Sequence, residues 1–332
     1  MNLKKVYIII VNYNGWKDTI ECLESLANLK YLHFQIIIID NASQDDSVYQ
    51  IQDWVRRNGV LDLIVSSSTS LNETQIATEK ILLIRSMTNL GFAGGNNIGV
   101  QFATSRDDAD FIWLLNNDTV VEEFSLEHFI DYLDSNSEKV GIVGSKVMEY
   151  YNRNIIQAAG GGKFIKILGH SYLLGGEKDE GQYDKPVKID YVHGASMFIP
   201  VSFIKDVGLM SEEYFLYFEE LDWSKRGLRR GWKTGYAHRS VIYHKGGAST
   251  TKGTTGSYLE NSSTLFSDFY YQRSKILFTK KFYWFCLPTV YLSFLLTIAN
   301  RIRRKQYNRI PMLLKLLFNP KSTSIKSALL HP

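Results

Sequence analysis

Short apolar runs that end in polar residues constrain the fold of this chain more than any other feature. Three of these runs read VYIIIV, QIIII and FIWLL. Runs of this length are typical of strands that are buried on both faces of a parallel sheet. The polar side chains that directly follow the runs are Asn12, Asp40, Asn116, Asn117 and Asp118.

Helical patterns alternate with these runs along the first half of the chain. The expected strands are residues 6–11, 35–39, 61–65, 81–85, 111–115 and 141–145, and the expected helices lie near residues 15–29, 46–57, 96–105 and 125–135. Residues 66–80 predict a polar surface excursion, and the glycine-rich residues 158–181 predict loops and short hairpins. The alternation indicates an α/β fold with a mostly parallel, Rossmann-like sheet flanked by helices. Because the carboxyl ends of parallel strands face the ligand in such sheets, we expect a binding site there.

Charge is distributed unevenly along the chain. Of 38 Lys and Arg residues, 12 lie from Tyr271 onward, and none of the 34 Asp and Glu residues does. An acidic body with a wholly basic tail indicates that the tail meets an anionic partner. The apolar residues beside these charges favour an anionic membrane surface, and we expect no nucleic-acid partner.

An uncharged segment at residues 282–300, FYWFCLPTVYLSFLLTIAN, precedes the basic stretch RIRRK. Its length is near the minimum for a spanning helix. Four polar residues at helical spacing line one face, which are Thr289, Ser293, Thr297 and Asn300. This stripe favours a helix in the membrane interface, to which residues 310–318 could add a second one. A true span and a helix packed on the domain stay open alternatives.

The glycine-rich stretch at residues 89–99, NLGFAGGNNIG, precedes the FIWLL strand. Its glycines allow the backbone to approach a ligand, and the helix that follows offers free N–H groups to anions. The spacing does not fit a dinucleotide-binding fingerprint. A tight turn is the alternative interpretation.

Three carboxylates, Glu219, Glu220 and Asp222, lie within four residues and are flanked by aromatic side chains. Like charges and apolar neighbours both raise the pKa of a carboxyl group, and such a group can take a proton from a hydroxyl. The alternative is a helix N-terminus whose acids complement the helix dipole. His244 follows another short apolar run, which makes a metal site shared with Asp118 plausible, although a lone histidine is usually structural.

The ordered motifs IVNYNG, IIDNAS, NLGFAGGNN, LLNNDT, HGASMF, FLYFEELD and YHKGGAS resemble those of the family 2 inverting glycosyltransferases. The similarity covers about residues 5–250 and is greatest to the bacterial rhamnosyltransferase-like subgroup. It implies a GT-A fold, a nucleoside-diphosphate-sugar donor and Mg²⁺ or Mn²⁺. By the same resemblance, Asp40 receives the base of the donor, Asp118 is a metal ligand in a DXD-type motif, and His244 completes the metal site.

The resemblance also implies the roles of the remaining motif residues. The residues expected to bind the nucleotide sugar are Asn12, Asn14, Asp40, Asn41, Asn89, Gly91, Gly94, Asn116 and Asn117. Relatives commonly read Glu-Asp-x-Asp where this chain reads Glu-Glu-Leu-Asp, so Glu220 is the expected catalytic base and Asp222 the alternative. The candidates for contacts with the acceptor are His193, Gly194, Ser196, Glu219 and Trp223.

The resemblance therefore implies an inverting glycosyltransferase, with rhamnose from dTDP-rhamnose favoured by the subgroup, and a polyprenyl-linked glycan as acceptor would explain the basic, apolar tail. We expect a GT-A domain over residues 1–265, divided into a nucleotide-binding half (1–120) and a catalytic half (121–265). Residues 266–332 are expected to form a helical extension that attaches a cytoplasmic protein to the inner face of the cell membrane. A sugar-phosphate nucleotidyltransferase and a non-catalytic carbohydrate-binding relative are the alternatives, and a homodimer is left open.

Overall fold

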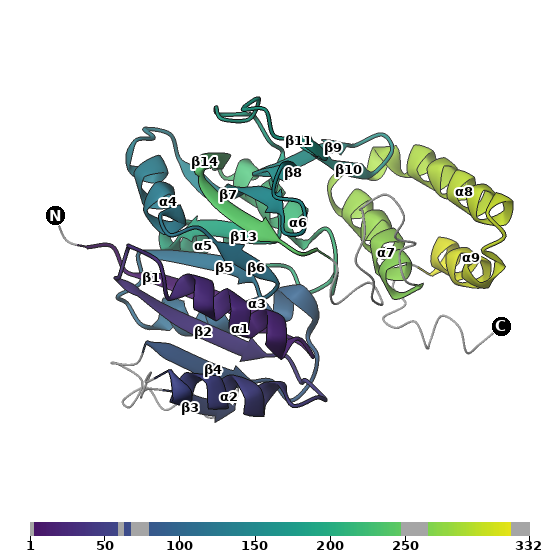
Figure 1. Cartoon of the computed structure of the whole chain (residues 1–332). Helices are drawn as coiled ribbons and strands as arrows, with labels where there is room; N and C mark the ends of the chain where they lie inside the picture. Colours follow the sequence, from purple (N-terminus) through teal and green to yellow (C-terminus); the bar gives the residue numbers. More distant parts are fainter. Residues whose placement is uncertain (1–2, 59–62, 68–79, 247–264, 320–332) are drawn as a thin grey trace. The chain divides into compact units, whose positions relative to one another are not determined.

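The computed structural model describes residues 3–58, 63–67, 80–246 and 265–319. The chain divides into two compact units (Figure 1). The sheet unit comprises Met1–Lys163, Leu173–Glu212 and Glu220–Ser249, and the helical unit comprises Phe164–Tyr172, Glu213–Glu219 and Thr250–Pro332. Most of the polar excursion expected at residues 66–80 and the last residues of the YHKGGAS motif lie outside the described residues.

The described part of the sheet unit contains a central mixed sheet with the order β11-β8-β7-β13-β5-β1-β2-β4-β3, and β14 joins it through β7 and β6. The strands are β1 (Val6–Asn12), β2 (Phe34–Asp40), β3 (Leu63–Ser67), β4 (Ile81–Arg85), β5 (Phe111–Asn116), β6 (Thr119–Val121), β7 (Val140–Glu149), β8 (Ile155–Ala159), β11 (Glu177–Lys178), β13 (Ser196–Pro200) and β14 (Lys233–His244). The short strands β9 (Gly161–Ile165), β10 (His170–Leu173) and β12 (Tyr191–Val192) lie off this sheet. Residues 158–181, expected as loops and short hairpins, contain the short strands β9, β10 and β11 with turns between them.

The strand register brings the predicted polar residues to one edge of the sheet. Strand β1 pairs in parallel with β2 on one side and with β5 on the other. Asn12 lies opposite Asp40, and Val11 lies opposite Asn116. The chain runs from β1 to β2 and on to β4 on one side, and α3 then leads back to β5 on the other side of β1. Such a change of direction in strand order is where α/β proteins bind ligands.

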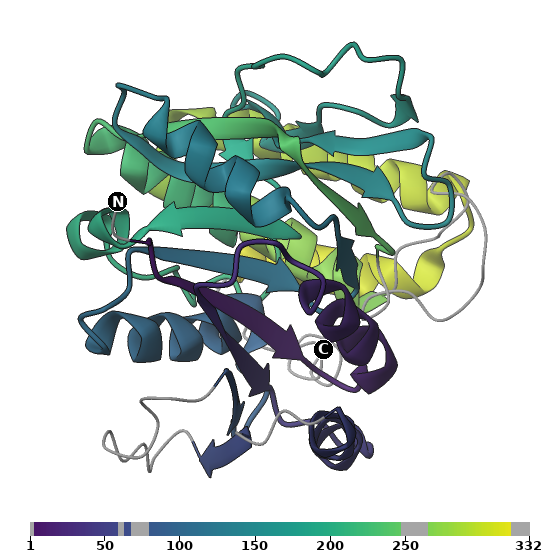
Figure 2. The same cartoon turned by 60° about the vertical axis from the view of Figure 1, so that its left-hand side comes forward.

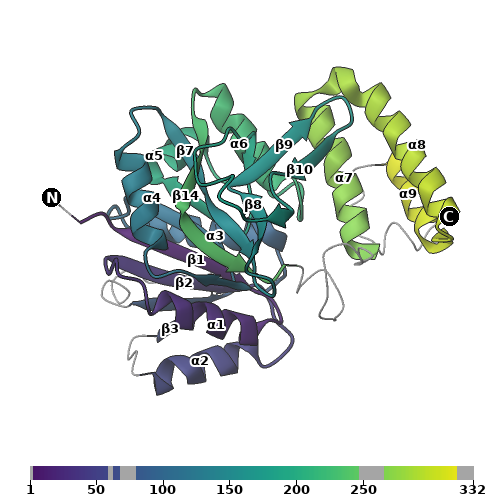
Figure 3. The same ribbon diagram turned by 45° about the horizontal axis from the view of Figure 1, so that its top comes forward.

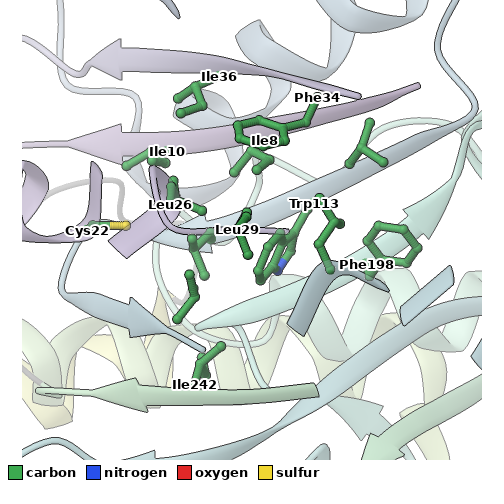
Figure 4. Close-up of a cluster of buried hydrophobic side chains, with 14 of the residues drawn as sticks. Ile8, Ile10, Cys22, Leu26, Leu29, Phe34, Ile36, Trp113, Phe198 and Ile242 are labelled. Carbon is green, nitrogen blue, oxygen red and sulfur yellow. The ribbon is translucent and has the colours of Figure 1, made fainter. Parts of the chain in front are cut away.

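Alternate residues of each strand pack on opposite faces of the sheet, because successive side chains of a strand point to opposite sides. Ile8 and Ile10 share a core with α1, α2 and α4, and Trp113 and Phe198 complete that core (Figure 4). Tyr7 and Ile9 share the other core with α3, α5 and α6. The helices are α1 (Trp16–Leu26), α2 (Ser47–Arg57), α3 (Gly91–Ser105), α4 (Ser125–Asp134), α5 (Val201–Val207) and α6 (Glu219–Arg229). The sheet therefore has helices on both faces (Figure 2), as expected.

Helix α3 begins at Gly91, five residues before the expected start, so most of the glycine-rich stretch is helical. The reason is close packing on β1. A Cβ atom at Gly95 would lie 2.9 Å from Val11 Cγ1, and one at Gly99 would lie 2.6 Å from Ile9 Cγ2. Glycine at these two positions lets the helix backbone approach the strand.

The described part of the helical unit contains α7 (Leu265–Phe282), α8 (Leu287–Arg303) and α9 (Ile310–Phe318), with short 3₁₀ turns at Trp284–Cys286 and Tyr307–Arg309 (Figure 3). Phe269, Phe294 and Met312, one from each helix, meet in its apolar core. The expected helical extension is present, and the second short helix at residues 310–318 has the expected bounds. Helix α7 was not expected as a separate element.

The polar side chains along one face of α8 form hydrogen bonds within the helical unit. Thr289 Oγ1 donates to the carbonyl oxygen of Ile167 at 2.5 Å, and Ser293 Oγ accepts from Lys275 Nζ at 2.8 Å. The exposed residues of this segment are instead apolar, and include Trp284, Phe285, Leu292, Leu295 and Leu296. Trp284–Arg303 is the one described segment long and apolar enough to cross a membrane, and little of it is buried.

Candidate active site

Asn12 and Asp40 form a buried pair at the carboxyl ends of β1 and β2. Asn12 Nδ2 donates to Asp40 Oδ1 at 3.0 Å and to Ser43 Oγ at 3.1 Å. Asn12 Oδ1 accepts from Thr19 Oγ1 at 2.9 Å, so the orientation of the amide is fixed from both ends. Asp40 Oδ2 accepts the Ser43 backbone N–H at 3.2 Å, and a carboxylate can accept about four hydrogen bonds.

Asn14 shapes the loop after β1. Its φ of 52° lies in the left-handed region, which asparagine tolerates better than most residues. Its backbone N–H donates to Ser43 Oγ at 3.0 Å, and its Oδ1 accepts the Gln44 N–H at 2.7 Å. The loops that follow β1 and β2 are thereby held together.

Asn41 ties the end of β2 to the start of α3. Its Nδ2 donates to Asn89 Oδ1 at 3.2 Å and to Gly91 O at 3.1 Å, and its Oδ1 accepts the Leu90 N–H at 3.0 Å. Gly91 has a φ of 71°, which suits glycine at this turn. A Cβ atom at Gly94 would lie 2.6 Å from Leu90 Cβ, so crowding within the turn accounts for that glycine.

Asp118 and His244 meet although they are 126 residues apart in sequence. Antiparallel pairing of β6 with β14 places His244 opposite Thr119, the residue after Asp118. His244 Nε2 lies 3.2 Å from Asp118 Oδ1 and 3.3 Å from Asn116 Nδ2. Asn117 points elsewhere, since its Nδ2 donates to Thr19 Oγ1 at 3.0 Å and to Gly15 O at 3.3 Å.

Gln157 on β8 is a site residue that the sequence reasoning missed. Its Oε1 lies 2.7 Å from His244 Nδ1, and both side chains are buried. If His244 Nδ1–H donates to this oxygen, the Nε2 lone pair of the neutral ring is directed at Asp118. His244 Nε2 and Asp118 Oδ1, 3.2 Å apart, would then direct lone pairs at each other. A proton or a metal ion between the two atoms would remove this repulsion. Gln157 lies one residue before the stretch expected as loops and short hairpins (158–181), and no sequence signal connects it to His244.

The electrostatics of this cluster favour an ionised carboxylate next to neutral His193. Burial acts to raise the pKa of Asp118, but His244 and the backbone lower it, and the net effect is a pKa below the ordinary value. Burial, and then the charge of His244, lower the pKa of His193 to about 3. The ring centroids of His193 and His244 are 5.6 Å apart. His193 is therefore neutral at physiological pH and adds no positive charge to the site.

The donor set suits a divalent cation that shares its coordination with a ligand. Among the described residues, no group of three or more His, Cys, Asp or Glu side chains could hold a metal ion. Asp118 and His244 supply a carboxylate and an imidazole, and both groups can be ligands of Mn²⁺. Magnesium sites likewise use one or two carboxylates, with substrate phosphates and water completing the octahedron.

Glu220 and Asp222 lie on α6 in different environments. The side chain of Glu220 keeps part of its surface accessible, and burial raises the pKa of its carboxyl to about 7, against a backbone hydrogen bond that lowers it. Asp222 is fully buried and accepts Arg226 Nε at 2.6 Å. Arg226 also donates to the carbonyl oxygens of Val207 and Leu209, so Asp222 belongs to a structural network.

The residues expected to contact the acceptor differ in how far they are buried and in which elements they lie. Ser196 is fully buried and accepts the indole N–H of Trp113 at 2.9 Å. Trp223 is also fully buried, donates to Gly208 O at 2.8 Å, and packs against Phe203. Both residues therefore have packing roles, and their contact with an acceptor stays a prediction. Gly194 is half-buried next to Phe92, and Glu219 is the buried first residue of α6.

Comparison of the sequence with models of known protein families shows the family of this chain. Residues 7–206 match the model of the family named Glycosyl transferase family 2. The chain belongs to glycosyl transferase family 2. The match spans β1 through most of α5, and so includes Asp40, Asp118 and His193 but ends before α6 and β14.

One relative of this family 2 chain is distant in sequence. A low-salt glycan biosynthesis hexosyltransferase, Agl10 of Haloferax volcanii, is 24% identical over 205 residues, which are 60% of this chain and 63% of that protein. The matched region thus spans less than two thirds of the hexosyltransferase.

Solved structures share the fold at lower identity. A mannosyltransferase from Pyrobaculum calidifontis, in complex with GDP-Man and Mn²⁺, superimposes with a TM-score of 0.53 at 12% identity, covering 98% of this chain and 85% of that one. GalNAc-T7 with UDP, GalNAc and Mn²⁺ gives a TM-score of 0.55 at 17% identity, covering 73% and 44%. The expected GT-A fold is confirmed.

Proposed function

We propose that this chain is a glycosyltransferase that moves a sugar, with inversion, from a nucleoside diphosphate to an acceptor hydroxyl. The observation that carries the proposal is the set of polar residues at one edge of the sheet, where Asp40 ends β2, Asp118 follows β5, and His244 at the end of β14 lies 3.2 Å from Asp118. Family membership and a hexosyltransferase relative support the same activity.

The donor nucleotide is assigned to the carboxyl ends of β1 and β2. Asp40 keeps acceptor capacity for the N–H groups of a base, while Asn12 holds it in place. The backbone N–H groups at the start of α3 can face the anionic part of the ligand. Two structural neighbours contain UDP or GDP-Man, which supports a nucleotide-sugar donor.

Asp118 and His244 are the residues that would hold Mg²⁺ or Mn²⁺, and Gln157 would fix the ring of His244 as their partner. When bound, the cation neutralises the charge that develops on the departing diphosphate. The ionised state of Asp118 and the neutral state of His193 are both compatible with this role.

Glu220 is assigned as the general base. Its carboxylate accepts the proton of the acceptor hydroxyl while the oxygen bonds to the anomeric carbon and the bond to the nucleoside diphosphate breaks on the opposite side. A pKa of about 7 is suited to proton transfer near neutral pH. Asp222 is a poorer candidate because it is fully buried and paired with Arg226.

The donor and acceptor are proposed from the character of the chain. dTDP-rhamnose is the favoured donor through the subgroup resemblance, and a polyprenyl-linked glycan is the favoured acceptor. The exposed apolar side chains of the α8 segment, with Arg303 and Arg304 at its end, suit attachment to an anionic membrane surface. His193, Gly194 and Glu219 are retained as candidates for acceptor contacts.

Product analysis tests the proposal. The full chain is incubated with Mn²⁺, a panel of dTDP-, UDP- and GDP-sugars and a polyprenyl-linked oligosaccharide, and products are examined by mass spectrometry and by NMR of the new linkage. We expect release of a nucleoside diphosphate and one added sugar with inverted configuration. Release of pyrophosphate would instead identify a nucleotidyltransferase, and binding without turnover would identify a non-catalytic relative.

A further inference from the structure

The turn between β9 and β10 carries a group of apolar side chains. Ile165, Ile167 and Leu168 are all exposed, as is Lys166 among them. These four residues are called the hairpin tip below, and they belong to the helical unit. Apolar residues scattered singly over a surface are normal, whereas a contiguous group marks an interaction site. The hairpin tip is therefore a candidate contact surface.

The hairpin tip is attached to α8 (Figure 3). Thr289 Oγ1 of α8 donates to Ile167 O at 2.5 Å. Gly169, which follows the tip, has a φ of 58°, and a Cβ atom there would lie 3.1 Å from Val290 Cγ2 of α8. Glycine thus permits both the left-handed turn and the close approach of the turn to the helix. The tip and α8 are therefore neighbouring parts of one surface in the helical unit.

Helix α8 buries one apolar face and exposes another. Val290, Phe294 and Ile298 recur every four residues and are buried, and the last two lie in the core shared with α7 and α9. Leu292 and Leu296, one turn apart, are 60% and 65% exposed. A helix on the surface of a soluble domain normally presents polar residues opposite its buried face. The exposed leucines of α8 are therefore placed for contact with an apolar partner.

The exposed leucines lie on the side of α8 that holds the hairpin tip. Thr289, which binds the tip, precedes Leu292 by three residues and Leu296 by seven, and residues at this spacing share one side of a helix. The apolar side chains of the tip and these two leucines therefore form one surface. It is called the apolar face below, and it consists of Ile165, Ile167, Leu168, Leu292 and Leu296.

Positive charges accompany the apolar face. Lys166 lies within the tip, and Arg303 follows Leu296 by seven residues on the same side of α8. Arg304 and Lys305 come next and are exposed, and no acidic residue occurs in α8, in α9 or beyond. A second copy of this chain would bring the same positive charges to the contact, whereas anionic lipid headgroups complement them. A bilayer also supplies the apolar layer that leucine and isoleucine side chains enter.

We propose that the hairpin tip and α8 dock together on a bilayer that contains anionic phospholipids, with the apolar face inserted into one leaflet and α8 lying parallel to the membrane. The inference rests on the proposed function in taking a membrane surface as the partner of α8. It adds the hairpin tip as a second inserting element, and it gives the helix one orientation.

Packing within the helical unit opposes a spanning orientation of α8. Because its buried side packs on α7 and α9, a spanning α8 would take both helices into the hydrocarbon layer. Helix α7 carries two buried cations. Lys275 Nζ donates to Ser293 Oγ of α8 at 2.8 Å, and Arg273 Nη1 donates to Tyr214 O at 3.3 Å. Charged groups are costly at the centre of a bilayer. With α8 parallel to the surface, both cations stay on the protein side of the helix.

Vesicle binding by the full chain tests the docking. Flotation with vesicles of phosphatidylcholine, alone or mixed with phosphatidylglycerol, measures the bound fraction of the wild type, Ile167→Glu and Leu296→Glu. Leu32→Glu is the matched control, because Leu32 is 72% exposed but belongs to the sheet unit. Thermal unfolding of each variant shows that it is folded.

We expect the wild type to bind the mixed vesicles at least about tenfold more tightly than phosphatidylcholine vesicles, because each basic residue near an anionic surface favours binding. Ile167→Glu and Leu296→Glu should each weaken binding at least about tenfold, because a side chain of this size then loses its burial in the leaflet. Leu32→Glu should stay within about twofold of the wild type. Wild-type binding by Ile167→Glu would overturn the role of the hairpin tip.

Cysteine labelling tests the orientation of α8. Lys280→Cys and Lys305→Cys introduce thiols at exposed positions on either side of the apolar segment, and the two native cysteines are buried. A membrane-impermeant thiol reagent is applied to one side of membranes from expressing cells, and the wild type gives the background. We expect both positions to be labelled from the same side. Labelling of the two positions from opposite sides would show that α8 spans the membrane and would overturn the proposed orientation.

Donor binding, measured on the same proteins with Mn²⁺, separates this inference from the proposed function. A chain that binds a nucleotide sugar but neither kind of vesicle would overturn the docking and leave the transferase intact. Vesicle binding without donor binding would support the docking and contradict the proposed transferase. Self-association without lipid that is lost in Ile167→Glu would identify a second copy of the chain as the partner of the apolar face, and would overturn the proposal.

Discussion

Polar side chains have different numbers of protein partners at the carboxyl ends of the central strands and in the helical unit. At the sheet edge, Asp40 and Asp118 are held by one or two neighbours and keep lone pairs for a ligand. In the helical unit, Asp268 lies between Arg309 and Arg301 at 2.9 and 3.0 Å, and Arg273 binds backbone carbonyls. The two carboxylates at the sheet edge therefore have acceptor capacity for the proposed ligand, whereas Asp268 and Arg273 are used in contacts within the helical unit.

This difference predicts how substitutions act in the two regions. Changes at the sheet edge and at Glu220 should alter binding or turnover while the fold survives. Changes among residues that are committed to protein contacts should alter stability, or the position of what they hold. The predictions below test this distinction in order of decreasing expected effect.

Glu220→Gln should give the largest effect. The amide is nearly isosteric with the carboxyl group but cannot accept the proton, so kcat should fall about 10²–10⁴-fold. Donor affinity, measured by calorimetry, should be preserved. Glu24→Gln, on α1, is a matched control that should keep wild-type kcat. A Glu220→Gln enzyme with wild-type kcat would remove α6 from the chemistry.

Gln157→Leu should weaken the metal site from a position that touches neither metal nor donor. Loss of the bond to His244 Nδ1 frees the ring orientation, so Mn²⁺ affinity should fall about 10–100-fold. Titration of donor binding against Mn²⁺ concentration measures the change. Excess Mn²⁺ should restore most of the donor affinity, and failure to do so would indicate damage to the fold instead.

The pH dependence of kcat should show the raised pKa of Glu220. The ionised carboxylate is the active form, so the rate should fall about tenfold for each pH unit below about 7. Asp118 stays ionised over this range because its pKa is below the ordinary value. An acidic limb near 4.5 would show that burial does not tune Glu220.

Gly99→Ala should change stability without changing the chemistry. The added methyl would lie 2.6 Å from Ile9 Cγ2, so we expect a loss of about 1–3 kcal/mol in the free energy of unfolding. Urea denaturation followed by circular dichroism measures this loss. Gln101→Ala, at an exposed position of the same helix, should change stability by less than about 0.5 kcal/mol. Equal stabilities of the two variants would contradict the close helix–strand contact.

The strand ends were predictable from sequence because each lies within a few residues of an apolar run. The runs before Asn12, Asp40 and Asn116 have the length and the continuous apolar character of strands buried on both faces, and parallel pairing then brings their ends together. The start of α3 was predicted too late because glycine was read as a loop former, although here it permits close packing. Contacts such as Gln157–His244 and Arg273–Tyr214 join distant segments, so no local pattern indicates them.

Metal-dependent binding of the donor tests the central claim most directly. Calorimetric titration of dTDP-rhamnose, UDP-sugars and GDP-sugars into the wild-type chain and Asp118→Ala would be carried out with Mn²⁺ and with EDTA. The account predicts that one donor binds the wild-type chain tightly with Mn²⁺, and that EDTA or Asp118→Ala weakens this binding by at least about tenfold. Binding that is equal with Mn²⁺ and EDTA, or equal in the two proteins, would contradict the assignment of Asp118 and His244.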